Sequence, residues 1–114
     1  MRSAGLLVLV VAWAGVAACS DSTGSTGGHG NTITVSNNFF SPTPDTATAG
    51  VVTFTWSNAS NSHNVTWLTG PAPLPTPSPT QTSGTYAPTL QAGTYTYHCT
   101  LHSSVGMTGT IVVQ

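Results

Sequence analysis

Charged side chains are almost missing from this sequence. Its 114 residues include one Lys or Arg and two Asp or Glu, which gives a formal net charge of −1. The one basic residue, Arg2, lies at the start of the chain, so no basic patch can form elsewhere. Proteins that bind nucleic acid or anionic membranes through charge need such a patch. We therefore expect no nucleic acid partner and no charge-driven membrane binding.

Long apolar runs are also missing. The longest run, from Leu6 to Trp13, is shorter than the roughly 20 residues of a spanning helix. It follows one positive charge and precedes small residues, which is the order of an export signal. The residues before Cys19 resemble the lipobox of bacterial lipoproteins, so we predict a lipoprotein signal peptide over residues 1–18 and a lipid on Cys19. An ordinary signal cut nearby, which would leave a free Cys19 thiol, is the alternative.

The segment after the predicted signal has nothing to bury. Residues 19–30 are rich in Ser, Thr and Gly, as in a flexible tether, and we expect His29 to be exposed there. Residues 31–114 should form a single small domain, expected to be a monomer. The protein should then be exported and held on the periplasmic side of a bacterial membrane only through its lipid.

Cysteine is scarce, and the chain has only two. If Cys19 carries a lipid, Cys99 has no partner for a disulfide. An unpaired cysteine in an exported protein needs another explanation. Cys99 is therefore a candidate for a chemical role.

Strand and turn signals are present throughout, and no segment has a helical period. Short strands with turns between them favour an all-β sandwich. The Pro-rich residues 69–84 should form an irregular loop. The segments expected to be strands are 31–35, 46–49, 51–58, 63–68, 85–90, 94–99 and 107–114. In residues 94–99, Tyr95, Tyr97 and Cys99 should face the core and His98 should face outward.

Soft ligand atoms gather near the C-terminus. Cys99, His102 and Met107 form a C-x2-H-x4-M pattern, and His63 begins a separate predicted strand. A thiolate and two imidazoles suit copper in both oxidation states, and a weak axial thioether completes a blue-copper site. Zinc also accepts imidazole and thiolate, but a thioether is unusual for it. We therefore expect one type 1 copper ion and no catalytic residues.

The motifs SHNV, around His63, and YHCTLHSSVGM, from Tyr97 to Met107, resemble those of cupredoxins, closest to the plastocyanin branch. The resemblance implies an eight-stranded Greek-key β-sandwich with His63, Cys99 and His102 as equatorial copper ligands and Met107 as the axial one. It also implies that Asn64 and Thr100 hydrogen-bond to each other and fix the ligand loop. The acidic docking patch of many plastocyanins is absent, and His98 replaces a frequent Tyr.

The expected function is one-electron transfer in the bacterial cell envelope. Four protein ligands leave no open position for a substrate, which argues against an enzyme. The resemblance implies that transient redox partners dock on an apolar surface around His102. A periplasmic copper chaperone or buffer, and a structural lipid-tethered β-domain, remain as alternatives. His98 is expected to be an exposed strand residue, with a second electron route or a pH-sensitive surface group as the alternative.

Overall fold

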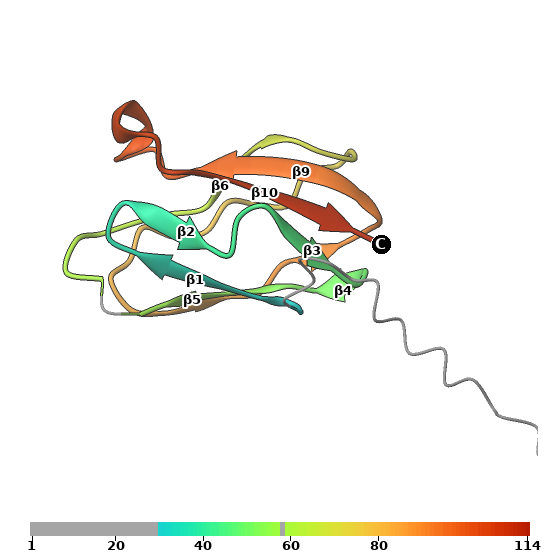
Figure 1. Ribbon diagram of the computed structural model, residues 1–114, viewed down its shortest axis with the longest axis horizontal. Helices are drawn as coiled ribbons and strands as arrows, with labels where there is room; N and C mark the ends of the chain where they lie inside the picture. Colours follow the sequence, from blue (N-terminus) through green and yellow to red (C-terminus); the bar gives the residue numbers. More distant parts are fainter. Residues whose placement is uncertain (1–29, 58) are drawn as a thin grey trace, which may run out of the picture.

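The computed structural model describes residues 30–57 and 59–114 and shows two β-sheets packed face to face (Figure 1). One sheet has the strand order β2-β1-β5-β7, and the other has the order β3-β10-β9-β6. Strands β4 and β8 form a separate two-stranded pair. The all-β sandwich predicted from the sequence is confirmed. Among the described residues, no helix has the length and apolar character needed to cross a membrane.

The first sheet is built on β1. This strand pairs with β2 antiparallel through the turn at residues 37–38 and with β5 in parallel. Strand β7 pairs with β5 at the sheet edge. The bounds are β1 Thr32–Ser36, β2 Phe39–Ser41, β5 Thr53–Trp56 and β7 Gly84–Tyr86.

The second sheet is built on the β9–β10 hairpin, whose connection carries the predicted ligand loop. Strand β10 also pairs with β3 in parallel, and β9 pairs with β6. The bounds are β3 Asp45–Ala47, β6 Thr66–Thr69, β9 Gly93–His98 and β10 Thr108–Val113. The small pair consists of β4 Gly50–Val51 and β8 Thr89–Leu90.

The core forms between the inner faces of the two sheets. Strand β9 alternates as expected, with Tyr95 and Tyr97 buried. Strand β5 alternates as well, with Phe54 and Trp56 buried on the opposite sheet. Phe54 and Tyr97 contact edge to face, with ring centroids 5.2 Å apart. Such aromatic contacts add to the apolar burial that holds a small sandwich together.

Several details of the fold differ from the sequence prediction. Strand β2 lies where no strand was expected, and only three of its residues pair there. The strand expected over 63–68 begins at Thr66, and His63 instead forms an isolated bridge with Gln81. The segment 85–90 is divided between β7 and β8, since Pro88 lies between them and cannot donate to a ladder.

Residues 70–83 form an irregular segment that connects β6 to β7 and is called the strap here. Its five prolines alternate with other residues over 70–79, so half of the backbone donors of that stretch are missing. The strap is fixed by hydrogen bonds to neighbours, including Ser78 N–H to Val65 O at 3.0 Å and Gln91 Nε2 to Ala72 O at 3.2 Å. It therefore covers the open side between two edge strands without regular pairing.

Candidate metal centre

The loop from Cys99 to Met107 connects β9 to β10 and lies at the end of the sandwich opposite the C-terminus (Figure 1). It contains a short 3-10 helix, η1, at Ser103–Val105. Gly106 follows with a φ of 81°, a left-handed conformation that suits glycine. The chain thereby turns back, so that Met107 N–H donates to His102 O at 3.2 Å and Cys99 N–H donates to Met107 O at 3.0 Å.

His63 reaches the same end of the molecule from a distant part of the chain. Its N–H and C=O both pair with the backbone of Gln81 in the strap, at 3.0 Å each. The indole Nε1 of Trp56 also donates to His63 O, at 3.2 Å. The backbone of His63 is thus held from two sides, which fixes the direction of its ring.

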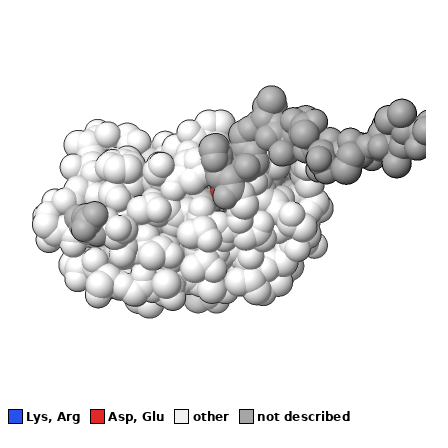
Figure 2. Space-filling model, turned by 60° about the horizontal axis from the view of Figure 1, so that its bottom comes forward, with Lys and Arg blue, Asp and Glu red and all other residues white. Residues whose placement is uncertain are grey.

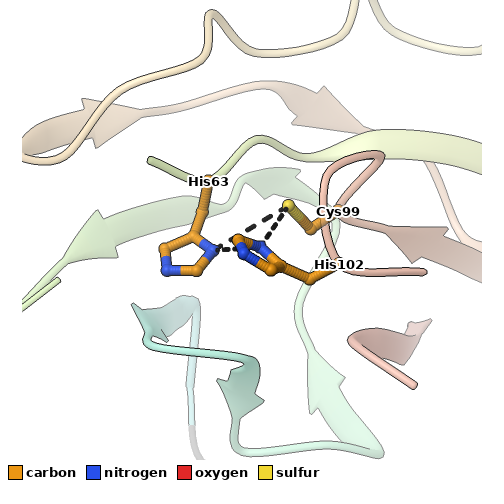
Figure 3. Close-up of side chains that lie close together, drawn as sticks. All are labelled: His63, Cys99 and His102. Atoms are coloured by element: carbon orange, nitrogen blue, oxygen red, sulfur yellow. Dashed lines mark hydrogen bonds between the residues drawn. The ribbon is translucent and has the colours of Figure 1, made fainter. Parts of the chain in front are cut away.

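Figure 3 shows the side chains of His63, Cys99 and His102 converging on one point. The Sγ atom of Cys99 lies 3.9 Å from His63 Nδ1 and 3.6 Å from His102 Nδ1, and the two Nδ1 atoms are 3.1 Å apart. The point in the plane of this triangle that is equidistant from all three atoms lies about 2.1 Å from each of them. Metal–nitrogen and metal–sulfur bonds in protein sites have lengths of roughly 2.0–2.3 Å. The three donors are therefore already spaced to hold one ion.

The site is closed from solvent on most sides. His63, Cys99 and Met107 have no exposed surface, whereas His102 is partly exposed. Burial lowers the pKa of His63 below its ordinary value of 6.5, and the neighbouring His102 lowers it further. The neutral imidazole is the form that binds a metal ion. Burial thus favours the ligating form of His63.

Asn64 and Thr100 lie beside the metal ligands and are linked twice. The Nδ2 of Asn64 donates to Thr100 Oγ1 at 2.7 Å, and Thr100 N–H donates to Asn64 Oδ1 at 3.0 Å. Asn64 also donates to Thr80 Oγ1 in the strap at 3.2 Å. These bonds connect the segment after His63 to the ligand loop and to the strap.

The predicted site residues fall into three groups in the structure. His63, Cys99 and His102 meet with their ligand atoms, and Met107 is buried at the end of the same loop. His98 alternates with the buried Tyr97 and Cys99 and is only partly buried, in register with Thr66 and Thr108 across the outer face. Cys19, His29, and the signal and tether segments lie outside the described residues.

Three residues that support the site were missed by sequence reasoning. Trp56 and Gln81 bond to the backbone of His63, and Asn37 Oδ1 lies 3.2 Å from its Nε2. In the sequence, Asn37 is recognisable only as part of an Asn-Asn pair, which is typical of a turn. Nothing in the sequence relates that turn to a histidine 26 residues later.

The donor set fits copper. Two imidazole nitrogens and one thiolate in a trigonal arrangement, with a thioether following in the loop, are characteristic of type 1 copper sites. The buried thioether of Met107 at the end of the same loop favours copper over zinc, for which a thioether is an unusual ligand. The predicted cofactor, one type 1 copper ion, is confirmed by this arrangement.

Comparison with solved structures gives the same fold. Oxidised plastocyanin from Dryopteris crassirhizoma is 25% identical, with a TM-score of 0.59 over 73% of this chain and 99% of that chain. A reduced mutant of amicyanin is 25% identical, with a TM-score of 0.58 over 80% of this chain and 88% of that chain.

A Cu-containing nitrite reductase from Thermus scotoductus SA-01 also matches. It is 23% identical, with a TM-score of 0.58 over 73% of this chain. The match covers only 22% of that larger protein. It therefore shows the shared fold of one part and not a shared activity.

A search of curated protein sequences found no match. The family model of the cupredoxin-like domain, in contrast, matches residues 6–113, which is nearly the whole chain. Together with the two-sheet sandwich and the His-Cys-His-Met donor set, this match identifies the family. The chain belongs to the cupredoxin-like domain family.

Proposed function

We propose that the protein is a one-electron carrier that uses a single type 1 copper ion. The observation that carries this proposal is the triangle of donor atoms of Cys99, His63 and His102, spaced by 3.1–3.9 Å around a buried point. Plastocyanin and amicyanin, which share this fold at 25% identity, support the proposal. Bound copper would supply a one-electron step between its Cu(I) and Cu(II) forms.

The residues of the chain favour this step by holding the donor atoms still. Backbone hydrogen bonds fix His63 to the strap, and the paired bonds of Asn64 and Thr100 fix the ligand loop. A site preformed in this way has little to rearrange when its charge changes. Support of the first ligands by such outer partners is a general feature of metal sites.

An enzymatic role is less well supported by the same geometry. Catalytic metal sites keep a position open for water or substrate, whereas four protein side chains are available here. Among the described residues, no second group of His, Cys, Asp or Glu side chains is close enough to hold another ion. His98, the nearest additional histidine in sequence, lies on the outer face. Our proposal is therefore a carrier and not an oxidase or a reductase.

Partners should dock at the ligand loop. His102 is partly exposed there, and the neighbouring Leu101 and Val105 are 53% and 65% exposed. The surface carries almost no charge, and the face in Figure 2 is nearly free of charged side chains. An apolar, uncharged contact of small area suits the short encounters of electron transfer. We propose that the partners are redox proteins with an apolar docking surface.

We also propose that the protein works outside the cytoplasm as a lipoprotein. The support comes from the sequence alone: the apolar run from Leu6 to Trp13, the small residues before Cys19, and the Ser/Thr/Gly-rich residues 19–30. Mass spectrometry of Cys19 in the membrane fraction would show whether it is acylated.

The first experiment is a visible spectrum of residues 20–114 after addition of Cu(II). An intense blue absorption that disappears on reduction is expected from a thiolate–copper site. Cys99→Ser should abolish the colour. His98→Asn, one residue away but facing outward, is the matched control and should keep it.

Two outcomes would count against the carrier function. A colourless protein that binds only Cu(I) would favour copper handling. A protein that binds neither form would leave a structural β-domain as the explanation.

A further inference from the structure

Asn37 contacts the ring of His63 on the side facing away from the other ligands. Asn37 is the first residue of the turn between β1 and β2, and its Oδ1 lies 3.2 Å from His63 Nε2. Among the described residues, Asn37 Oδ1 is the hydrogen-bond partner of His63 Nε2. The contact joins two sites that are 26 residues apart in the chain.

The orientation of the Asn37 amide is fixed by a second neighbour. The backbone N–H of Asn61 lies 3.1 Å from the same amide atom. A backbone N–H can only donate, so the atom that it meets must be the amide oxygen. The Nδ2 of Asn37 is then free to donate to Ser60 Oγ, at 2.7 Å. The Asn61 N–H thus excludes the flipped amide, and the other two contacts are compatible with this orientation.

This orientation determines which nitrogen of His63 carries the proton. The oxygen of Asn37 can only accept, so Nε2 must be the protonated nitrogen of the neutral ring. The other nitrogen, Nδ1, then has a free lone pair. That lone pair points toward Cys99 and His102, where Nδ1 lies 3.9 Å from the sulfur and 3.1 Å from the second ring.

We propose that Asn37 is a positioning residue of the metal centre, which holds His63 in the Nε2–H tautomer and so prepares Nδ1 as a ligand. This inference depends on the proposed copper site. Its mechanism is the one by which a partner on the distal nitrogen orients a metal-binding histidine. The amide of a β-turn supplies that partner here, and the same amide also fixes the segment that leads to His63 through Ser60 and Asn61.

The test compares three variants. Asn37→Leu keeps the branched shape but removes the acceptor, and because His63 is fully buried, water cannot easily replace it. Asn37→Asp keeps an acceptor for both Nε2–H and Asn61 N–H. Ser60→Ala is the matched control, since it loosens the same segment without touching the histidine.

The first measurement is nitrogen NMR of the imidazole rings in the metal-free protein at about pH 8, where histidines are neutral. The wild type, Asn37→Asp and Ser60→Ala should show His63 protonated on Nε2. Asn37→Leu should show a mixture of tautomers. A wild-type ring protonated on Nδ1, or an unchanged tautomer in Asn37→Leu, would overturn the proposal.

The second measurement is affinity for Cu(I) and Cu(II) in competition with a chelator. Loss of an outer partner typically lowers metal affinity by about 10–100-fold, and we expect this loss in Asn37→Leu but not in Ser60→Ala. Asn37→Asp should recover most of it. Equal losses in Asn37→Leu and Ser60→Ala would show that Asn37 only holds the loop. If the wild type binds no copper, the proposed function fails, whereas the NMR measurement still decides the role of Asn37.

Discussion

Asn64 and Thr100 exchange two hydrogen bonds, side chain to side chain at 2.7 Å and backbone N–H to side chain at 3.0 Å. Asn64 follows His63, and Thr100 follows Cys99, so the pair links the two separate origins of the metal ligands. Asn64 is only 6% exposed, so water cannot easily take over the hydrogen bonds of its amide if the side chain is removed.

The first prediction compares the two members of this pair. Asn64→Leu leaves the donors of Thr100 and Thr66 without their acceptor, and we expect a loss of about 1–3 kcal/mol in unfolding free energy. Thr100→Val removes one hydrogen bond, while Asn64 keeps Thr80 as a partner, so the loss should be about 1 kcal/mol. Urea denaturation of the metal-free protein measures both. A larger loss in Thr100→Val would contradict this ranking.

The second prediction concerns pH. Burial and His102 lower the pKa of His63 in the folded protein, so the unfolded chain takes up the proton first as the pH falls. The metal-free protein should keep its full stability above about pH 6.5 and lose part of it below that pH, toward the lowered folded pKa. Thermal unfolding between these limits measures the slope. In His63→Asn the slope should be smaller, and an identical slope would assign the effect to other groups.

The third prediction concerns the attachment of the strap. Tyr86 accepts a hydrogen bond from Trp67 Nε1 at 3.1 Å and donates one to Thr76 O in the strap. Tyr86→Phe leaves the indole N–H of Trp67 unpaired in a side chain that is 7% exposed, which should cost about 1–3 kcal/mol. Tyr95→Phe is the control, because it removes only a donor to the exposed Gln91. Chemical denaturation should show a larger loss of unfolding free energy in Tyr86→Phe than in Tyr95→Phe. Equal losses would argue against this role of Tyr86.

The fourth prediction concerns Gly109 in β10. A Cβ at this position would overlap the ring and hydroxyl of Tyr97, which is fully buried and has no room to move. Gly109→Ala should therefore destabilise the fold by about 1–3 kcal/mol. Thr108→Ala, at the neighbouring exposed position, should change stability by less than about 0.5 kcal/mol. A neutral Gly109→Ala would mean that the ring of Tyr97 can shift at low cost, which would contradict this prediction.

The fifth prediction follows from the lack of charge. Electrostatic steering can change association rates by about 10–1,000-fold, and salt removes this effect. With only one basic and two acidic residues in the whole chain, this protein has little field to screen. Electron exchange between oxidised and reduced copies, measured by NMR line broadening, should change by less than about twofold between low and high salt. A steep salt dependence would sink this prediction.

Much of the fold and of the metal centre could be predicted from the sequence, because both depend on local patterns. Strict alternation identified the buried face of β9, and the close spacing of Cys99, His102 and Met107 placed three ligands in one loop. Copper chemistry requires a second imidazole, and the resemblance of the SHNV motif to cupredoxins indicated His63.

The outer contacts could not be predicted in the same way. Asn37, Gln81 and Trp56 support His63 only because β1, the strap and β5 end near it after folding. Their residue types are ordinary for turns, loops and strands. Their local sequence does not distinguish them from residues that have no role at a metal site. Their support of His63 therefore depends on tertiary geometry alone.

The first described strand begins at the end of the sandwich that lies farthest from the ligand loop (Figure 1). Asn31 is held there by hydrogen bonds from its Nδ2 to Thr48 O and Val51 O, at 2.8 and 2.9 Å. If Cys19 is acylated, residues 19–30 could span at most roughly 40 Å between the bilayer and this point. The domain would then be anchored to the membrane at one end, with the copper site at the opposite, free end. Its working radius would be set by the tether, and partners embedded in the same membrane could be reached without release from it.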